Sequence, residues 1–224
     1  ERSRPAAGVI ASAYISTVAG FPNVITCDMG GTSFDVSLVA DGESSLSAQT
    51  SIDYGMIVRT PMIEITTIGA GGGSFASVDT LGLIRIGPES AAADPGPACY
   101  GRGGTRATVT DANVLLGYLD PSDFLAGAMQ LDIQAAEDAI ACDVGTPLGM
   151  TPIEAAAAII EVVNENMAQA ARMYVAERGG DLERAVMVAF GGGGPLHAHQ
   201  VARKLGVREI LIPEAAGVFS ALGF

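Results

Sequence analysis

The chain has 224 residues, 49% of them hydrophobic, which is enough for one large domain or for one domain with a small appendage. Its net charge of −13 argues against a nucleic-acid partner, because neutralising phosphates requires clustered lysine and arginine. The sequence contains no long uncharged apolar run, so we expect no membrane span.

Three cysteines lie far apart and lack the C-x-x-C spacing of a zinc site or redox motif: Cys27, Cys99 and Cys142. Reduced thiols fit a cytoplasmic protein, so we expect a cytoplasmic location. The chain starts at Glu1 and stops at Phe224, just after an apolar stretch. We expect it to be a fragment of a longer protein.

The first third of the chain predicts a helix followed by a sheet. Residues 5–19 form a weakly amphipathic helical pattern. Residues 24–28 predict a buried strand, and residues 34–40, joined to it through Gly-Gly-Thr, predict a strand of alternating character. Residues 44–49 and 56–58 are expected to extend that sheet. Residues 64–67 lead into a second glycine loop, residues 69–74, before a predicted hairpin over residues 78–86.

The middle of the chain is irregular. Residues 87–108 are rich in proline, glycine and small side chains, and so long a loop inside a compact domain indicates a site or an interface. Thr110 and Asp111 are expected to cap a helix that ends near Tyr118, and residues 132–142 predict another helix. We expect residues 87–150 to form an insertion or subdomain.

The last third alternates helix and strand, which predicts α/β layers. Thr151 and Glu154 form a capping box for a long helix that ends at Gly179-Gly180. A strand over residues 185–190, a glycine turn, a helix over residues 195–205 and a strand over residues 209–212 follow.

The first candidate site is the turn between the two early strands. Gly30 and Gly31 let the backbone approach phosphate oxygens, and Thr32 and Ser33 add hydroxyl donors. The carboxylates of Asp28 and Asp35 flank this turn and suit a hydrated magnesium ion or the orientation of a water molecule. The alternative is a plain β-hairpin whose two aspartates cap the turn.

The second candidate site is a four-glycine turn between a strand and a helix. It contains Gly191, Gly192, Gly193 and Gly194. A helix N-terminus with free amides favours a nucleotide, although the turn lacks the lysine and hydroxyl residue of a P-loop. The alternative is a tight connection with no ligand.

These motifs together resemble a known family. The hairpin D-M-G-G-T-S-F-D-V-S resembles the second phosphate-binding hairpin of the sugar kinase, heat-shock chaperone and actin superfamily, and the four-glycine turn resembles its adenosine-side turn. The segments I-G-A-G-G-G-S, P-G-P-A-C-Y-G-R-G-G, T-V-T-D-A-N and F-G-G-G-G-P-L-H-A are similar to those of the hydantoinase A/5-oxoprolinase (N-methylhydantoinase A) family. The resemblance covers nearly the whole chain.

The resemblance implies a fold and an activity. The fold is the second lobe of an actin-like (ribonuclease H-like) ATPase: an α/β lobe with a mixed sheet flanked by helices and an irregular insertion. Members couple cleavage of ATP, with Mg²⁺, to the opening of a cyclic amide or imide such as 5-oxoproline or a hydantoin. A hydantoinase B-type partner and a first lobe, absent here, complete the enzyme, so the isolated chain is expected to be inactive.

Two other functions stay open. Related ATP-dependent ketone carboxylases of the acetone carboxylase type share this module, and bicarbonate dependence would distinguish them. A non-catalytic actin-like nucleotide-binding module would instead bind ATP tightly and release no small-molecule product.

Several further residues have competing interpretations. Cys99 is a candidate nucleophile, but a small buried side chain is the favoured interpretation. His197 and His199 point in different directions on a helix and are not expected to share a metal; His197 is interpreted as a capping or surface residue. Glu64 is a weaker candidate for an acidic group in the site. Some relatives have a histidine where this sequence has Thr66 and Thr67, so the role of that histidine cannot be assigned to either threonine.

Overall fold

The computed structural model describes residues 3–47, 50–52, 56–58 and 61–223. The chain divides into two compact units. Unit 1 contains Glu1–Asp28, Asp35–Thr67 and Ala168–Phe224, and unit 2 contains Met29–Phe34 and Ile68–Met167. The turn between β1 and β2 lies in unit 2 together with Met29 and Phe34, the strand residues that flank it, and the rest of both strands lies in unit 1.

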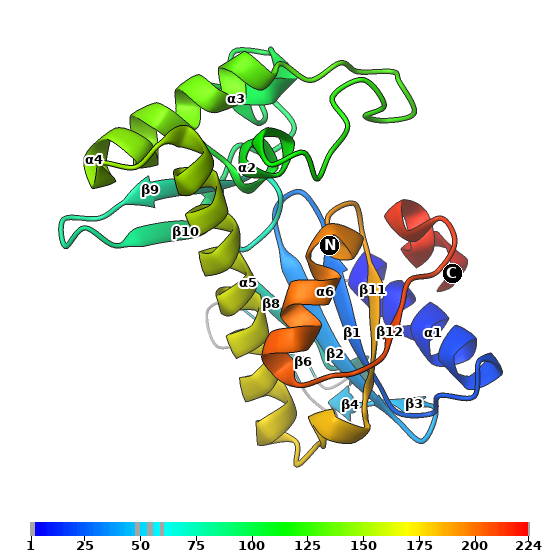
Figure 1. Cartoon of the computed structure of the whole chain (residues 1–224). Helices are drawn as coiled ribbons and strands as arrows, with labels where there is room; N and C mark the ends of the chain where they lie inside the picture. The colour runs from blue at the N-terminus through cyan, green and yellow to red at the C-terminus, as the bar shows by residue number, and fades with distance from the viewer. Residues whose placement is uncertain (1–2, 48–49, 53–55, 59–60, 224) are drawn as a thin grey trace. The chain divides into compact units, whose positions relative to one another are not determined.

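Unit 1 is built on a mixed sheet of six strands, in the order β12-β11-β1-β2-β3 with β8 also paired to β2 (Figure 1). The strands are β1 (Val24–Met29), β2 (Phe34–Ala40), β3 (Glu43–Ser44), β8 (Thr66–Ile68), β11 (Val186–Phe190) and β12 (Ile210–Leu211). β11 runs parallel to both β1 and β12, whereas β3 is antiparallel to β2. The predicted α/β class with a mixed sheet is therefore confirmed.

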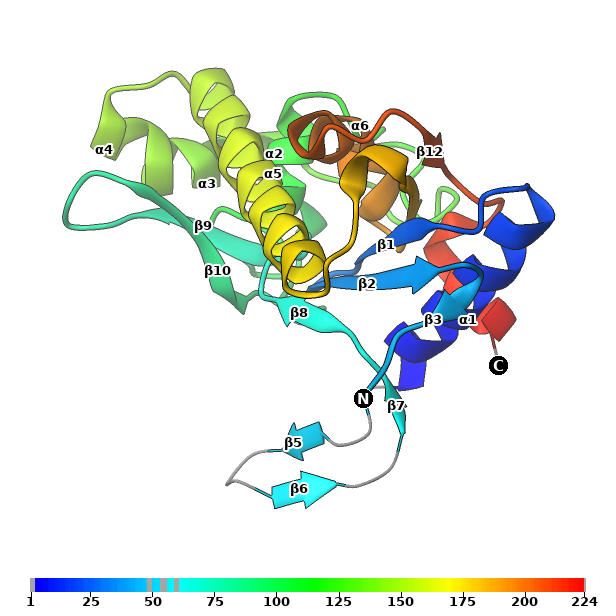
Figure 2. The ribbon, with the colours of Figure 1, turned by 90° about the horizontal axis from the view of Figure 1, so that it is seen from below.

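Helical segments cover both faces of this sheet, which explains why β1 and β11 are buried along their length (Figure 2). On one face lie α1 (Ser3–Val18) and the 3₁₀ segment η5 (Ala216–Gly223), and on the other lies α6 (Gly194–Leu205). The α1 face shares a core with Val24, Val188 and Phe190. Gly8 lets α1 approach closely, because a Cβ there would lie 2.5 Å from the Phe190 ring.

Two predicted sheet extensions are wrong except at Ser44, which lies in β3 of the six-stranded sheet. β4 (Leu46–Ser47) pairs with β7 (Met62–Ile63), and β5 (Thr50–Ile52) pairs with β6 (Met56–Val58), so each pair forms its own small sheet. The free edge of β2 is instead occupied by β3 and by β8, which leaves it no room for the segments between them. Residues 48 and 49 of the predicted segment lie outside the described residues.

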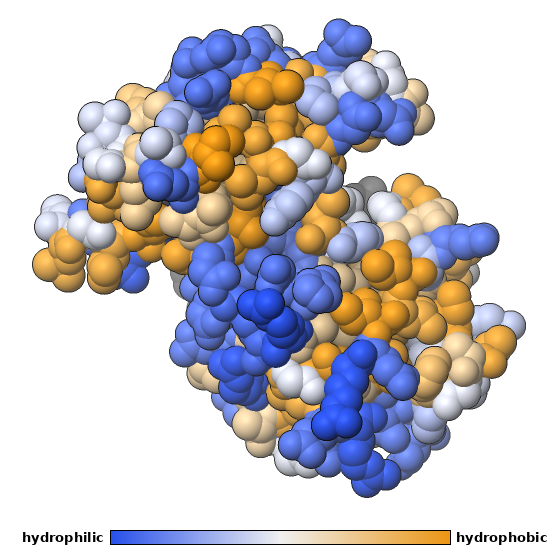
Figure 3. Space-filling model, in the orientation of Figure 1, coloured by the Kyte–Doolittle hydropathy of each residue, from blue (hydrophilic) through white to orange (hydrophobic). Residues whose placement is uncertain are grey.

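Unit 2 begins with an antiparallel hairpin of β9 (Ser74–Val78) and β10 (Ile84–Ser90), longer than the hairpin predicted from the sequence. Leu81 and Leu83 are exposed at its end, where hydrophobic residues are visible in Figure 3. The helical segments that follow are η2 (Ala98–Tyr100), α2 (Val109–Leu115), α3 (Ile133–Ile140), η3 (Ala141–Gly145), α4 (Thr146–Leu148) and the first part of α5 (Pro152–Glu177). A further 3₁₀ turn, η4 (Leu182–Arg184), follows α5 in unit 1.

Capping residues set the helix starts. Thr108, not Thr110, caps α2, because Thr108 exchanges hydrogen bonds with Asp111 in a capping box. The predicted cap position was wrong by two residues, since the true cap is the last extended residue before the helix. The box of Thr151 and Glu154 at the start of α5 is confirmed.

Among the described residues, no single helix is long and apolar enough to cross a membrane. One pair of helices, bent by 86° at their junction, passes by length and composition only.

Candidate functional site

The first candidate site is the tip of the β1–β2 hairpin, residues 30–33. The Gly30 amide donates to the Ser33 carbonyl at 3.0 Å, which closes the turn, and Gly31 and Thr32 are exposed. A Cβ built on Gly30 or Gly31 meets nothing within 4 Å, and neither residue has a positive φ. The fold itself therefore does not require glycine at either position, and the tip leaves open space for a ligand.

Two carboxylates stand at the base of this tip, as the sequence predicts. Asp28 is the half-buried fifth residue of β1, between buried Cys27 and Met29, and Asp35 is the buried second residue of β2. Burial first, and then the charge of Asp35, raise the pKa of Asp28 to about 6 from its ordinary value of 3.8. A positive charge brought close to both carboxylates would lower this pKa again.

Thr67 is a partner of this site that the sequence does not reveal. It lies on β8, and its hydroxyl donates a short hydrogen bond to the Asp35 carboxylate. The two residues are 32 positions apart, and only the pairing of β8 with β2 brings them together. Thr67 therefore orients Asp35, and no sequence pattern signalled this.

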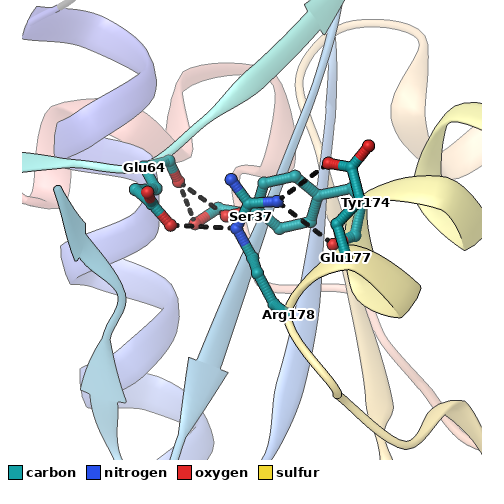
Figure 4. A network of polar contacts seen from close by, with 5 residues as sticks. All are labelled: Ser37, Glu64, Tyr174, Glu177 and Arg178. Carbon is teal, nitrogen blue, oxygen red and sulfur yellow. Dashed lines mark hydrogen bonds and ion pairs between the residues drawn. The ribbon is translucent and has the colours of Figure 1, made fainter. Parts of the chain in front are cut away.

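A network of polar contacts holds the segment that leads into β8 (Figure 4). The Glu64 carbonyl accepts from the Ser37 hydroxyl at 2.8 Å and from the Tyr174 hydroxyl at 3.0 Å, while the Glu64 carboxylate pairs with Arg178 at 2.9 Å. The Arg178 guanidinium also stacks 3.8 Å above the Tyr174 ring. Glu64 is thus part of a structural network, which explains this acidic residue without a catalytic role.

The second candidate site is the glycine turn of residues 191–194, between β11 and α6. The Gly191 amide donates to the Ala216 carbonyl at 2.9 Å, and Gly191 has a φ of 82°, which favours glycine. Gly192 is exposed, and a Cβ there meets nothing within 4 Å. Gly193 is the N-cap residue of α6 and Gly194 is its first residue. Glycine offers no side chain to cap the first amides of the helix.

The position of His197, in the helix that follows this turn, differs from the predicted one. His197 is 2% exposed rather than on the surface, and burial lowers its pKa to about 4. The reason is that α6 packs this side against the sheet, together with Ala198 and Val201. His199, two residues on, is exposed.

Cys99 is a buried structural residue, in agreement with the favoured interpretation. Its side chain is fully buried, its amide donates to Asp111 at 2.8 Å, and burial together with the Asp111 charge raises the pKa of its thiol. A nucleophilic cysteine requires a depressed pKa, so this environment does not activate Cys99.

The first site offers a cation two carboxylates as donors. Within the described part of the chain, no group of three or more His, Cys, Asp or Glu side chains is placed to hold a metal ion. The two carboxylates of Asp28 and Asp35 are hard oxygen donors, which suit magnesium, an ion that keeps several waters and takes substrate phosphates as ligands. The residues present therefore fit Mg²⁺ bound together with a nucleotide, and not an all-protein metal site.

The mixed sheet, the two glycine turns and the helices that cover the sheet define a lobe of the actin-like ATPase class. Two solved structures support this assignment. A nucleotide-free acetone carboxylase matches with a TM-score of 0.89 at 34% identity, covering 98% of this chain and 31% of that one. The ATP-dependent caprolactamase of Pseudomonas jessenii matches with a TM-score of 0.87 at 40% identity, covering 97% and 31%.

The chain belongs to the Hydantoinase/oxoprolinase family, whose model matches residues 2–224. By sequence, it is 41% identical to the caprolactamase alpha subunit of Pseudomonas jessenii, over 99% of this chain and 32% of that protein. It is also 40% identical to the 5-oxoprolinase of Saccharomyces cerevisiae, over 99% of this chain and 18% of that protein. The chain thus spans a third or less of the length of these relatives.

Proposed function

We propose that this chain is part of an enzyme that uses ATP to open a cyclic amide or imide of the 5-oxoproline or hydantoin type. The observation that carries the proposal is the β1–β2 hairpin, whose tip presents open space beside Gly30 and Gly31 and whose base holds Asp28 and Asp35. The family and its ATP-dependent caprolactamase member support the same reaction class.

The amide oxygen attacks the γ-phosphorus of ATP and ADP leaves. A water molecule then adds to the activated carbon, and the ring C–N bond breaks, which frees the amine and leaves an acyl phosphate. A second water molecule hydrolyses the acyl phosphate to the ring-opened acid and inorganic phosphate. Enzymes of phosphoryl transfer contribute mainly positioning and charge stabilisation, and the hairpin offers both.

Each residue of the hairpin has a role in this proposal. The Gly31 amide and the hydroxyls of Thr32 and Ser33 bind phosphate oxygens, and Gly30, whose amide closes the turn, lets the backbone lie close to them. Asp28 and Asp35 hold the hydrated Mg²⁺ or orient the attacking water. Mg²⁺, when bound with ATP, supplies positive charge that offsets the charge of the phosphates. Thr67 keeps the Asp35 carboxylate in one orientation.

The glycine turn of residues 191–194 is proposed to contact the adenosine side of the nucleotide. Its support is local: Gly192 is exposed with open space at its Cβ, and the α6 amides begin there. A backbone surface of this kind accepts a flat base without a dedicated side chain.

The complete enzyme is proposed to need more than this chain, because its relatives are at least three times as long and several are subunits. A first lobe and a hydantoinase B-type partner would supply the remaining contacts with nucleotide and substrate, so the isolated chain is expected to be inactive. We propose a cytoplasmic location; the three cysteines are free thiols, as a reducing compartment maintains them.

A carboxylase is the second candidate, favoured by the acetone carboxylase match at a TM-score of 0.89. In that case the hairpin would hold the same phosphates while ATP activates a ketone and bicarbonate. The chemistry of the hairpin is common to both reactions, so the substrate distinguishes them.

The test is ADP release by the complete protein with its partner, using lactams, imides and ketones with and without bicarbonate. Release stimulated by 5-oxoproline, caprolactam or a hydantoin, with the ring-opened acid as product, is expected. Release that requires a ketone and bicarbonate would move the protein to the carboxylases. Absence of any stimulation would contradict both and favour a non-catalytic nucleotide-binding module.

A further inference from the structure

The second glycine loop, residues 69–74, has no role in the function described so far. It connects β8 to β9, and within unit 2 it contacts the tip of the β1–β2 hairpin. The Gly72 amide donates to the Gly30 carbonyl at 3.0 Å, and the Gly73 amide donates to the Gly31 carbonyl at 2.6 Å. Two consecutive carbonyls of the tip are therefore held by one loop.

Holding these carbonyls fixes the direction of two amides. The Gly30 carbonyl shares a planar peptide unit with the Gly31 N–H, and the Gly31 carbonyl shares one with the Thr32 N–H. Neither bond is cis, and in a trans peptide unit the C=O and N–H point in opposite directions. With both carbonyls turned toward the second glycine loop, the amides of Gly31 and Thr32 are turned away from it, and both residues are exposed.

The contact is too close for any side chain. A Cβ on Gly71 would lie 2.5 Å from both the nitrogen and the carbonyl carbon of Thr32, and a Cβ on Gly73 would lie 2.9 Å from the Gly31 oxygen. Carbon atoms do not approach backbone this closely, so an alanine at Gly71 forces the tip to move. Neither Gly71 nor Gly73 has a positive φ, so packing against the tip is what requires glycine here.

The first turn of α2 holds the loop from the other side. The Gly72 carbonyl accepts from the Thr110 amide at 2.7 Å and from the Thr110 hydroxyl at 2.8 Å. Buried Asp111 fixes this turn, accepting from the Thr108 amide at 2.9 Å and from the Cys99 amide at 2.8 Å. The tip, the second glycine loop and α2 thus form one continuous hydrogen-bonded stack.

We propose that the second glycine loop is a positioning element that turns the Gly31 and Thr32 amides toward the phosphates of ATP, with Gly71 and Thr110 as its positioning residues. The inference rests on the proposed function, because it assigns the loop to the same phosphate site. These residues act through the tip and do not touch the nucleotide.

The test uses the complete protein with its partner and compares the binding of MgATP with that of adenosine. Gly71→Ala is expected to raise the Kd for MgATP at least about tenfold, the effect of losing one hydrogen bond to a charged group. The Kd for adenosine is expected to stay unchanged, because adenosine has no phosphate. Ala139→Gly, in α3 of the same unit, is the control that lowers stability without touching either loop.

Thr110 supplies a second, milder test that applies even where Gly71→Ala does not fold. Thr110→Val removes the hydroxyl donor and keeps the shape, so it is expected to weaken MgATP binding selectively, whereas Thr110→Ser is expected to restore it. If the loop variants lost affinity for MgATP and adenosine equally, or lost affinity for neither, the positioning role would be overturned and the proposed function would stand. Failure of the wild-type protein to bind MgATP at all would overturn the proposed function and this inference with it.

Discussion

The tip of the β1–β2 hairpin and the second glycine loop are both rich in glycine, yet a side chain would meet opposite surroundings in the two. At Gly30 and Gly31 a Cβ meets nothing within 4 Å, whereas at Gly71 it would lie 2.5 Å from the backbone of Thr32. In the loop, glycine is a requirement of packing. At the tip, the folded chain gives no reason for glycine, which supports the proposal that the tip binds phosphates.

The comparison also separates two kinds of substitution. An alanine in the second glycine loop should disturb both folding and the tip, while an alanine at the tip should leave the fold intact and obstruct only a ligand. The same distinction applies to the glycine turn of residues 191–194, where Gly192 is open and Gly191 has a φ of 82°. The predictions below test this division between ligand-facing and structural residues.

The largest effect is expected at the acidic base of the tip. Asp35→Asn keeps the size of the side chain and removes its charge, so ADP release by the complete enzyme is expected to fall by about a hundred- to ten-thousandfold, the range for a catalytic acid–base or orienting group. Steady-state ADP release checks this, with Asp120→Asn on an exposed loop as the matched control. Retained turnover in Asp35→Asn would remove the hairpin from the mechanism.

Asp28 links the site to stability. Its folded-state pKa of about 6 lies above the ordinary value of 3.8, so the folded protein binds the proton more tightly than the unfolded chain does. Protonated Asp28 therefore contributes stability that is fully present below about pH 3.8 and is lost as the pH rises through about 6. Asp28→Asn is therefore expected to raise the free energy of unfolding at pH 8 by on the order of 2 kcal/mol, with little change at pH 3.5.

Denaturant unfolding of the chain at the two pH values measures this effect, and ADP release by the complete enzyme measures the cost to function. A variant that is stabilised at pH 8 yet loses turnover would show that Asp28 is kept for chemistry. Destabilisation of Asp28→Asn at pH 8 would instead mark this carboxylate as a structural residue.

The glycine turn of residues 191–194 is also expected to face a ligand, but the adenosine part of ATP instead of its phosphates. Gly192→Ala adds a methyl group at an open, exposed position, so stability should be unchanged while the Kd values for adenosine and MgATP both rise, by about tenfold or 1.4 kcal/mol. Calorimetric titration with both ligands checks this. Weakening of MgATP alone would place the turn on the phosphates and contradict the adenosine assignment.

The smallest effect is expected in the Glu64 network, which belongs to the structural class. Tyr174→Phe removes the hydrogen bond to the Glu64 carbonyl and keeps the buried ring, so it should cost about 1 kcal/mol of stability. Nucleotide affinity should not change. A specific loss of MgATP binding in this variant would move the network into the site.

Local sequence signals predicted most of the fold and the two glycine sites. Strands β1 and β11 were predictable because they are mostly apolar and are followed by glycine, β2 because polar and apolar residues alternate along it, and α5 because the box of Thr151 and Glu154 marks its start. Asp28 and Asp35 stand out in sequence because they flank the turn directly. These features depend on residues within a few positions of one another.

Features set by long-range pairing could not be predicted in this way. Thr67 reaches Asp35 only because β8 pairs with β2, and the Gly72 contact with Gly30 joins residues 42 positions apart in the chain. The failed sheet extension has the same cause, since the edge of β2 accepts β8 and not the nearer segments. Two points stay predictions: residues 87–150 form an insertion, and the glycine sites bind ATP.

The most direct test of the phosphate assignment is the Kd for MgATP of the complete protein with Gly31→Ala, measured beside its thermal unfolding. Because the new Cβ meets only open space in the folded chain, the melting temperature is expected to stay unchanged. The Kd for MgATP is expected to rise by about tenfold or more, while the Kd for adenosine stays unchanged. An unchanged Kd for MgATP would show that the open space beside Gly31 is not where the phosphates bind.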